Sequence, residues 1–263
     1  MGLSVHTLTA DDRPDYASRV AALEASARYP LGDDFFTLDH GADYFAFFDR
    51  MGQTTHDVVL DRDRVVAVSA RVLRRIGDET AWYLCDLKVH PDYRGRHLPF
   101  RMAAHAIAGA YRRCSRGYGI SMNPSGGREN RVVRLLNRMR VVPLKHAAEL
   151  VLFSLDAAQM ADVAALVTAH RGPLSYLSLR GVKDVVLAST GAPMPLLHVQ
   201  FGPCAETGQA DVQPGAVHMF CSPRGDALTD ALLTRGVPED ASAAVVQHGM
   251  GEADFRFVLT SEI

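Results

Sequence analysis

The chain has 263 residues, of which 48% are hydrophobic and 22% are charged. A chain of this length can bury a full hydrophobic core, and we expect one large domain or two small ones. No apolar run approaches the ~20 residues that a membrane-spanning helix needs. The N-terminal segment lacks the basic and apolar regions of a secretory signal. We therefore expect a cytoplasmic protein with no membrane partner.

The cysteines also favour a cytoplasmic protein. The chain has four of them with no paired spacing: Cys85, Cys114, Cys204 and Cys221. Scattered cysteines are typical of reduced thiols. His198, Cys204, His218 and Cys221 lie in one region, but His218 and Cys221 are three positions apart on a predicted strand and so face opposite ways. The spacing does not match a zinc site, and we expect no bound metal.

The net charge of −2 hides an uneven distribution. Residues 62–140 carry 17 lysines and arginines against 6 acidic residues, whereas residues 1–61 carry 4 against 11 and residues 141–263 carry 7 against 13. A basic segment attracts polyanions, either a phosphorylated small molecule or nucleic acid. Aromatic residues that could stack on bases are sparse in this segment, so we expect a small molecule and no nucleic acid.

The hydrophobic pattern predicts strands and helices through the first 155 residues. Residues 5–9 are predicted to form a strand, and the helix after it carries acidic residues in its first turn and ends before Pro30. Three strands joined by short turns predict an antiparallel meander at residues 55–60, 65–76 and 80–89. A helix after residue 97, a strand at 118–122, a helix at 128–139 and strands at 141–144 and 149–155 follow.

The segment around residue 95 combines a strand, a basic turn and a helix. Side chains alternate with a period of two up to Val89, and Pro91 ends the strand because it has no amide proton. Arg94, Gly95 and Arg96 form the turn before the helix. Such a junction presents free backbone N–H groups and the positive end of a helix dipole, which together bind phosphate. The alternative is an ordinary solvated turn.

The run Leu-x-Val-x-Pro-x-x-Arg-Gly-Arg, from Leu87 to Arg96, resembles the pyrophosphate-binding signature of the GNAT acyltransferase superfamily. The resemblance covers about residues 1–155 and implies a GNAT-like fold and an acyl-CoA co-substrate. The family pattern Arg/Gln-x-x-Gly-x-Gly/Ala begins at Arg94, and His97 and Pro99 stand where it has small residues. Pro99 removes one N–H from the phosphate site, and His97 places a ring there.

The resemblance also implies roles for particular residues. The strand backbone would hold the pantetheine arm, and the Val89 N–H would polarise the thioester carbonyl. The turn and the N–H groups after it would bind the phosphates, and Asn130 matches a position that contacts the cofactor. The cofactor-binding residues so implied are Leu87, Lys88, Val89, Arg94, Gly95, Arg96, His97, Leu98, Pro99, Phe100 and Asn130.

Acyl transfer to an amine also needs a base and an acid for the leaving thiolate. Asp86 is the first candidate for the base, although it faces away from Leu87 unless a bulge re-aims it. An ion pair with a neighbouring arginine such as Arg71 is an equal alternative. The family often has a tyrosine as the acid at the position of Asn137 here. Either Tyr93 or Cys85 could replace it, or the thiolate could leave unassisted.

Five of the eleven phenylalanines lie within residues 35–48. We favour a role in the core beneath a helix, because aromatic side chains dominate core burial. The alternative is a wall of the acceptor or acyl pocket, since GNAT-like folds build that wall from this region.

From residue 156 the resemblance fades. The pattern predicts helices at 157–170 and 226–235, and strands at 174–179, 196–201, 217–221, 243–247 and 255–259. We expect an α/β (α+β) fold, with a mixed, mainly antiparallel GNAT-like sheet flanked by helices in residues 1–155. Residues 156–263 would form a smaller α/β domain that could be a degenerate second GNAT-like half.

Three functions stay open. The first is an N-acyltransferase, preferably an acetyltransferase, that moves an acyl group from acetyl-CoA or another acyl-CoA to an amine of a small molecule or peptide. The second is a long-chain or carrier-protein-dependent N-acyltransferase, with an arginine stripe at Arg131, Arg134 and Arg138 to dock an acidic carrier. The third is a non-catalytic GNAT-like ligand-binding protein. The oligomeric state is open too, a homodimer included.

Overall fold

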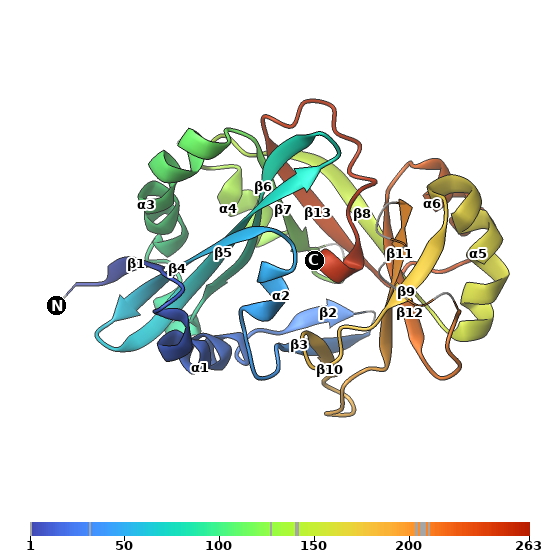
Figure 1. The fold of residues 1–263 in the computed structure, drawn as a ribbon, viewed down its shortest axis with the longest axis horizontal. Coiled ribbons are helices and arrows are strands. Elements are labelled where there is room, and N and C mark those ends of the chain that lie inside the picture. Colours follow the sequence, from blue (N-terminus) through green and yellow to red (C-terminus); the bar gives the residue numbers. More distant parts are fainter. Residues whose placement is uncertain are drawn as a thin grey trace.

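Ten strands form one continuous sheet through the protein (Figure 1). The computed structural model describes residues 2–31, 33–126, 128–139, 142–202, 205, 209 and 211–263. In the order in which they lie side by side, the strands are β1 Ser4–Leu8, β4 Gln53–Asp61, β5 Arg64–Ile76, β6 Glu79–Val89, β7 Gly117–Met122, β13 Ala241–His248, β8 Lys145–Leu155, β12 Val217–Pro223, β11 Leu196–Phe201 and β9 Leu174–Leu177.

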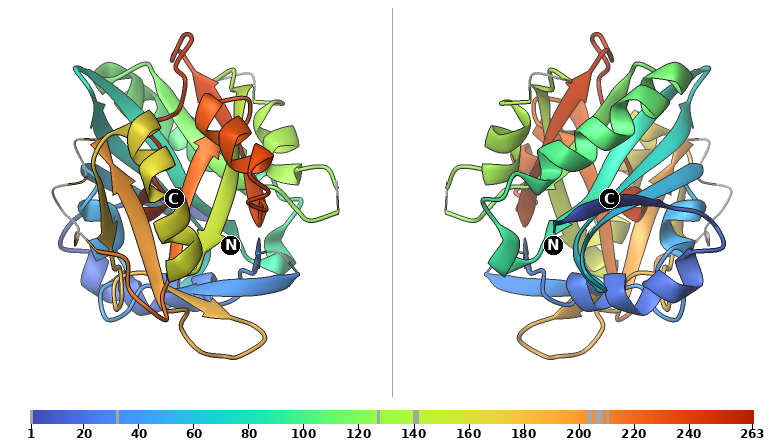
Figure 2. Two further views of the ribbon diagram at one scale, coloured as in Figure 1. Left: turned by 90° about the vertical axis from the view of Figure 1, so that its right-hand side faces the viewer. Right: turned by 90° about the vertical axis from the view of Figure 1, so that its left-hand side faces the viewer.

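A second, smaller sheet and the helices complete the fold. Helix α3 covers one end of the molecule, and α5 and α6 cover the other end (Figure 2). The small sheet has the order β10-β3-β2, with strands β2 Tyr29–Leu31, β3 Asp34–Asp39 and β10 Asp184–Leu187. The helices are α1 Arg13–Glu24, α2 Ala46–Asp49, α3 Leu98–Arg113, α4 Arg131–Leu136, α5 Ala157–Arg171 and α6 Ala227–Thr234, with a short 3-10 helix, η3, at Thr260–Glu262.

Alternation along the strands assigns the two faces of the sheet. Val58 of β4 packs with Val20 of α1 on one face, whereas the next residue, Val59, packs with Leu98 and Met102 of α3 on the other. This is the two-residue period of a strand that is buried on both sides. The predicted antiparallel meander is confirmed as β4, β5 and β6.

The strands β6 and β7 are parallel neighbours that part after three pairs. The pairs run from Trp82–Gly117 to Leu84–Gly119, beyond which β6 stays with β5 and β7 with β13. Close approach at this point requires glycine, because a Cβ on Gly119 would lie 3.1 Å from the Leu84 carbonyl oxygen. The sheet therefore opens into a notch between Cys85 and Ile120.

The C-terminal half repeats this arrangement. Strands β11 and β12 are also parallel, with three pairs that end at His198–Met219. In each half the second parallel strand leads through a helix, α4 or α6, to the strands β8 or β13. These two strands are exchanged, because β7 pairs with β13 and β12 pairs with β8. Outward from the β13–β8 pair, β7 and β6 on one side therefore correspond to β12 and β11 on the other.

Some predicted elements are wrong. Among the described residues of 141–144 there is no strand, because Pro143 has no N–H for a ladder. Residues 255–259 are not a strand either, since Phe255 has a φ of 53°. Helix α4 is shorter than predicted, and the small sheet was not predicted at all.

The described helices include none that is long and apolar enough to span a membrane. Cys85, Cys114 and Cys221 are free thiols, and Cys204 lies outside the described residues. Within the described part of the chain no three His, Cys, Asp or Glu side chains are grouped to hold a metal ion. The division into domains 1–155 and 156–263 stays a prediction, with β8 of the first part lying between two strands of the second.

Candidate functional site

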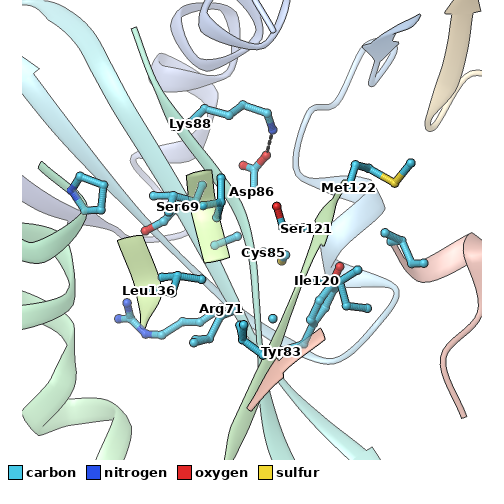
Figure 3. A pocket seen from close by; sticks show the side chains of 18 of the residues that line it. Ser69, Arg71, Tyr83, Cys85, Asp86, Lys88, Ile120, Ser121, Met122 and Leu136 are labelled. Carbon is cyan, nitrogen blue, oxygen red and sulfur yellow. Dashed lines mark hydrogen bonds and ion pairs between the residues drawn. The ribbon is translucent and has the colours of Figure 1, made fainter. Parts of the chain in front are cut away.

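A cavity of about 1020 Å³ opens at the notch between β6 and β7 (Figure 3). Cys85, Asp86 and Lys88 line it from β6, and Ile120, Ser121 and Met122 line it from β7. Other lining residues come from both faces of the sheet. One face contributes Tyr29, Phe36, Leu38, His40, Phe47 and Lys183, and the other contributes Pro99, Met102, Ala106 and Ile107 of α3. The volume is at the upper end for ligand sites.

A β-bulge in β6 aims Asp86 into this region. The register with β5 shifts between Val68 and Ala70, so that Ser69 faces both Asp86 and Leu87. Asp86 takes a φ of 58°, which is the left-handed region that aspartate tolerates better than most residues. In a regular strand Asp86 would face away from the side of Leu87, and a bulge such as this one is the feature predicted to re-aim it.

Asp86 is held by partners other than the one predicted. The Tyr44 hydroxyl lies 2.8 Å from Oδ1 and 2.7 Å from Oδ2, and the Lys88 ammonium forms an ion pair with Oδ1. The predicted partner Arg71 instead pairs with Asp57. The ion-pair interpretation is therefore correct in kind and wrong in its partner. Lys88 lies two residues further along the same strand and contacts Asp86 on the side of the sheet that faces Glu24 of α1.

A second buried carboxylate joins this network. Glu24 of α1 forms an ion pair with Lys88, and its side chain is only 2% exposed. The Tyr29 hydroxyl donates to one of its oxygens at 3.2 Å, and the Tyr44 hydroxyl, whose single proton is closer to Asp86, lies 3.3 Å from the other. Burial raises the pKa of Glu24, although the positive charge of Lys88 opposes that shift. Lys88 is thus shared between two carboxylates, and its side chain is not available to a cofactor.

Lys183 and His40 complete the polar part of the cavity. Lys183 lies between β9 and β10, and its Nζ is 4.2 Å from the centre of the Phe47 ring. Burial lowers the pKa of Lys183 to about 8, with the charge of Lys88 adding to the shift. Burial also lowers the pKa of His40 to about 4, so this imidazole is neutral at pH 7.

The basic turn stands open beside the cavity. Arg94, Gly95, Arg96 and His97 are exposed, and the lining residues Lys88 and Pro99 flank them. Within the described part of the chain, no hydrogen bond occupies the N–H groups from Gly95 to Leu98. The N–H of Phe100, predicted as a phosphate ligand, instead donates to the His97 carbonyl oxygen at 3.1 Å. The remaining N–H groups and the start of the sixteen-residue helix α3 suit a diphosphate.

His97 occupies a position that explains the glycine of the family pattern. It caps α3 with a φ of 58°, in the left-handed region where glycine is favoured. Leu98 is fully buried against Val59 and Val66, so only its backbone faces the turn. The Val89 side chain packs in the same cluster, and Leu87 lines the cavity.

The predicted residues on the other side of the notch have structural partners. The Asn130 side chain caps α4 by accepting hydrogen bonds from two backbone N–H groups and also donates to Met122 and Asn123 of the β7 end. Asn137 is exposed at the end of α4. The Tyr93 hydroxyl donates to Asp61 at 2.5 Å and does not line the cavity, whereas Cys85 lines it.

The phenylalanine cluster contributes both to the core and to the wall of the cavity. Phe45, Phe47 and Phe48 are buried in the core beneath α1, and Phe35, Phe36, Phe47 and Phe48 also line the cavity. Sequence reasoning missed Glu24, Tyr44, His40 and Lys183. For Glu24 the available signal was its own position, since it is a charged residue on the apolar face of the predicted helix.

The fold is similar to those of solved structures. A tandem GNAT protein from the clavulanic acid biosynthesis pathway superposes with a TM-score of 0.55 at 14% sequence identity, covering 96% of this chain and 100% of that one. A candidate acetyltransferase from Pyrococcus horikoshii superposes with a TM-score of 0.50 at 8% identity, covering 98% and 93%. No protein-family model and no curated protein sequence matches the chain. The similarity of structure extends over nearly the whole chain, which therefore has a GNAT fold.

Proposed function

We propose that the protein is an N-acyltransferase that moves an acyl group from acyl-CoA to an amine of a small molecule or peptide. The observation that supports it most is the cavity at the notch between β6 and β7, flanked by the open turn at Gly95–Leu98. A ligand with a diphosphate at one end and a thioester at the other fits such an arrangement. Arg94 and Arg96 would add charge to the N–H groups of the turn.

The acceptor amine would enter from the face lined by Phe36, Phe47 and Lys183. Its nitrogen would attack the thioester carbonyl carbon, the C–N bond would form, and the C–S bond would break as the thiolate leaves. Backbone N–H groups at the bulge would stabilise the charge that develops on the carbonyl oxygen. The acceptor must lose one proton, and the thiolate must gain one.

Asp86 is the proposed base. Three carboxylates line the cavity, and two of them pair with arginines that also line it: Asp57 pairs with Arg71, and Glu129 pairs with Arg134. Only Asp86 lies at the bulge itself. The Tyr44 hydroxyl and the Lys88 ammonium would then orient its carboxylate towards the reacting amine. No tyrosine lies at residue 137, and burial raises the pKa of the Cys85 thiol and makes it a weak acid, so the thiolate would take its proton from solvent.

The test is release of free thiol from acetyl-CoA in the presence of a panel of amines. The wild-type protein should turn over at least one of them, and Asp86→Asn should lower kcat by about 10²-fold or more while leaving the KM for acetyl-CoA unchanged. Asp92→Asn, an exposed carboxylate on the neighbouring turn, is the matched control.

The same assay separates the alternative functions. Octanoyl- and palmitoyl-CoA should be tested beside acetyl-CoA, because the α3 wall of the cavity is apolar and could hold a long acyl chain. Turnover with long chains alone would replace the acetyl donor by a long-chain donor. CoA binding with no turnover of any amine would contradict catalysis and leave a ligand-binding protein.

A further inference from the structure

Lys183 differs from the other buried or half-buried charged side chains of the cavity. Asp57 pairs with Arg71, Asp86 with Lys88, and Glu129 with Arg134. Lys183 lines the same cavity and is only 8% exposed. Within the described part of the chain, no carboxylate forms an ion pair with its ammonium and no hydrogen-bond acceptor contacts it.

The two carboxylates that attract Lys183 electrostatically already form ion pairs with Lys88. Both Asp86 and Glu24 contact Lys88, and the Tyr44 hydroxyl lies within hydrogen-bonding distance of each. One face of Lys183 rests on the Phe47 ring, a contact that stabilises the cation only in part. Among the described residues Lys183 therefore has no carboxylate in direct contact, and Glu24 and Asp86 attract its charge only from beyond ion-pair distance.

Burying a cation that contacts no carboxylate lowers the free energy of unfolding of the protein. Removing an ammonium from water disfavours its charged form, and the lowered pKa of Lys183 records this. Hydrophobic substitution of such a group costs a protein little, so a buried, unpaired lysine in a cavity is more readily explained by binding than by stability.

The surroundings restrict what could bind. A single ammonium balances one negative charge, which fits a carboxylate better than a doubly charged phosphate. Phe47 contacts Lys183, Phe36, Leu38 and Val185 also line the cavity, and the imidazoles of His40 and His198 lie close enough to Lys183 to interact with its charge. A ligand here would combine one carboxylate with an apolar body.

We propose that Lys183 binds the carboxylate of the acceptor, so that the acceptor is an amine of the amino-acid class with an apolar side chain. The proposal rests on the proposed acyl-transfer function, since it concerns the second substrate of that same cavity. Lys183 belongs to the C-terminal half, so this half would supply acceptor specificity to a site whose donor elements come from the N-terminal half.

The experiment uses product-like ligands that differ only in charge. N-acetyl-L-phenylalanine and its carboxamide are titrated into the CoA-saturated protein by calorimetry. The carboxylate should bind at least ten-fold more tightly than the carboxamide. Lys183→Met should abolish that difference, and Lys145→Met, which removes an exposed lysine of β8 that does not line the cavity, should keep it. Lys183→Gln serves as a second variant.

A structural role for Lys183 makes a different prediction. If the lysine only stabilised the fold, Lys183→Met would lower the Tm of the ligand-free protein, whereas the proposal predicts a Tm equal to or above that of the wild type. Equal affinity of carboxylate and carboxamide for wild-type protein, or an undiminished preference in Lys183→Met, would overturn the proposal alone. The protein is titrated with CoA before the product-like ligands are added. Absence of CoA binding at that stage would instead overturn the acyl-transfer function.

Discussion

The backbone of Asp86 decides where the central carboxylate points. Asp86 takes a φ of 58° at the bulge, and its carboxylate shares Lys88 with Glu24 and contacts the Tyr44 hydroxyl. In a regular strand Asp86 and Leu87 would face opposite sides, and Leu87 would face Ser69 alone. The cost of the left-handed conformation is offset by the contacts that the side chain gains.

The Tyr44 hydroxyl is the neutral component of this charged network. It lies 2.7 Å from Asp86 and 3.3 Å from Glu24, and Tyr44 is 1% exposed. Tyr44→Phe would leave both carboxylates without this donor, so we expect the free energy of unfolding to fall by about 1–3 kcal/mol in urea denaturation. Tyr29→Phe is the control, since its half-buried hydroxyl serves only Glu24, and it should cost less. Equal losses in the two variants would contradict the assignment.

His56 makes stability depend on pH. It is fully buried between the Phe45 and Phe48 rings, and neither ring nitrogen has a hydrogen-bond partner among the described residues. Burial lowers its pKa from 6.5 to about 4. Between these values the unfolded chain binds a proton that the folded protein does not, so stability is complete above pH 6.5 and is lost as the pH falls towards 4.

The wild-type free energy of unfolding should therefore drop by about 2 kcal/mol between pH 6.5 and pH 5 for this histidine. His40 adds a loss of the same sign, because its pKa is also about 4. In His56→Leu the slope should be reduced and not abolished, as measured by urea denaturation at each pH. An unchanged slope would show that His56 does not titrate as described.

At the scale of elements, the start of α3 combines two left-handed residues with a row of free N–H groups. Gly95 has a φ of 79° and His97 a φ of 58°. Glycine adopts this conformation without strain, whereas other residues pay roughly 1 kcal/mol. The histidine ring, exposed at the helix cap, lies close to where a phosphate would approach.

His97→Gly should raise the free energy of unfolding by about 1 kcal/mol or less and tighten CoA binding, because it removes both the strain and the ring. Gly95→Ala introduces the strain that His97→Gly removes, so it should lower stability by a similar amount. The two variants are compared by thermal unfolding with and without CoA. Weaker CoA binding by His97→Gly would mean that the imidazole itself contacts the phosphates.

At the scale of the whole molecule, local patterns predicted most elements and not their assembly. The meander of β4, β5 and β6 was predictable because its turns are short and its side chains alternate. The exchange of β8 and β13 was not, since it pairs residues 145–152 with 241–247 and no local signal encodes that contact. For the same reason Lys183, a loop residue, gave no sequence signal, whereas Asp86 and the turn at Arg94–Arg96 did.

The two halves differ at the point where their parallel strands part, β6 from β7 and β11 from β12. The notch of the N-terminal half opens into the cavity, but η3 covers the point where β11 and β12 part. The Thr260 hydroxyl donates to the Met219 carbonyl oxygen at 2.9 Å and lies 3.0 Å from His198, and Ser261 is bonded to Gln200 at 3.0 Å. The segment η3 thus packs at the place that is open in the N-terminal half, and His198, Met219 and Thr260 there line the same cavity, which predicts a single CoA site.

Isothermal titration of the protein with acetyl-CoA tests the central claim most directly. We expect one site per chain, with binding weakened at least ten-fold in Arg94→Ala/Arg96→Ala and unchanged in Arg62→Ala/Arg75→Ala, which removes two arginines outside the turn at Gly95–Leu98. Absence of binding, two equal sites, or full affinity in the Arg94→Ala/Arg96→Ala variant would contradict it.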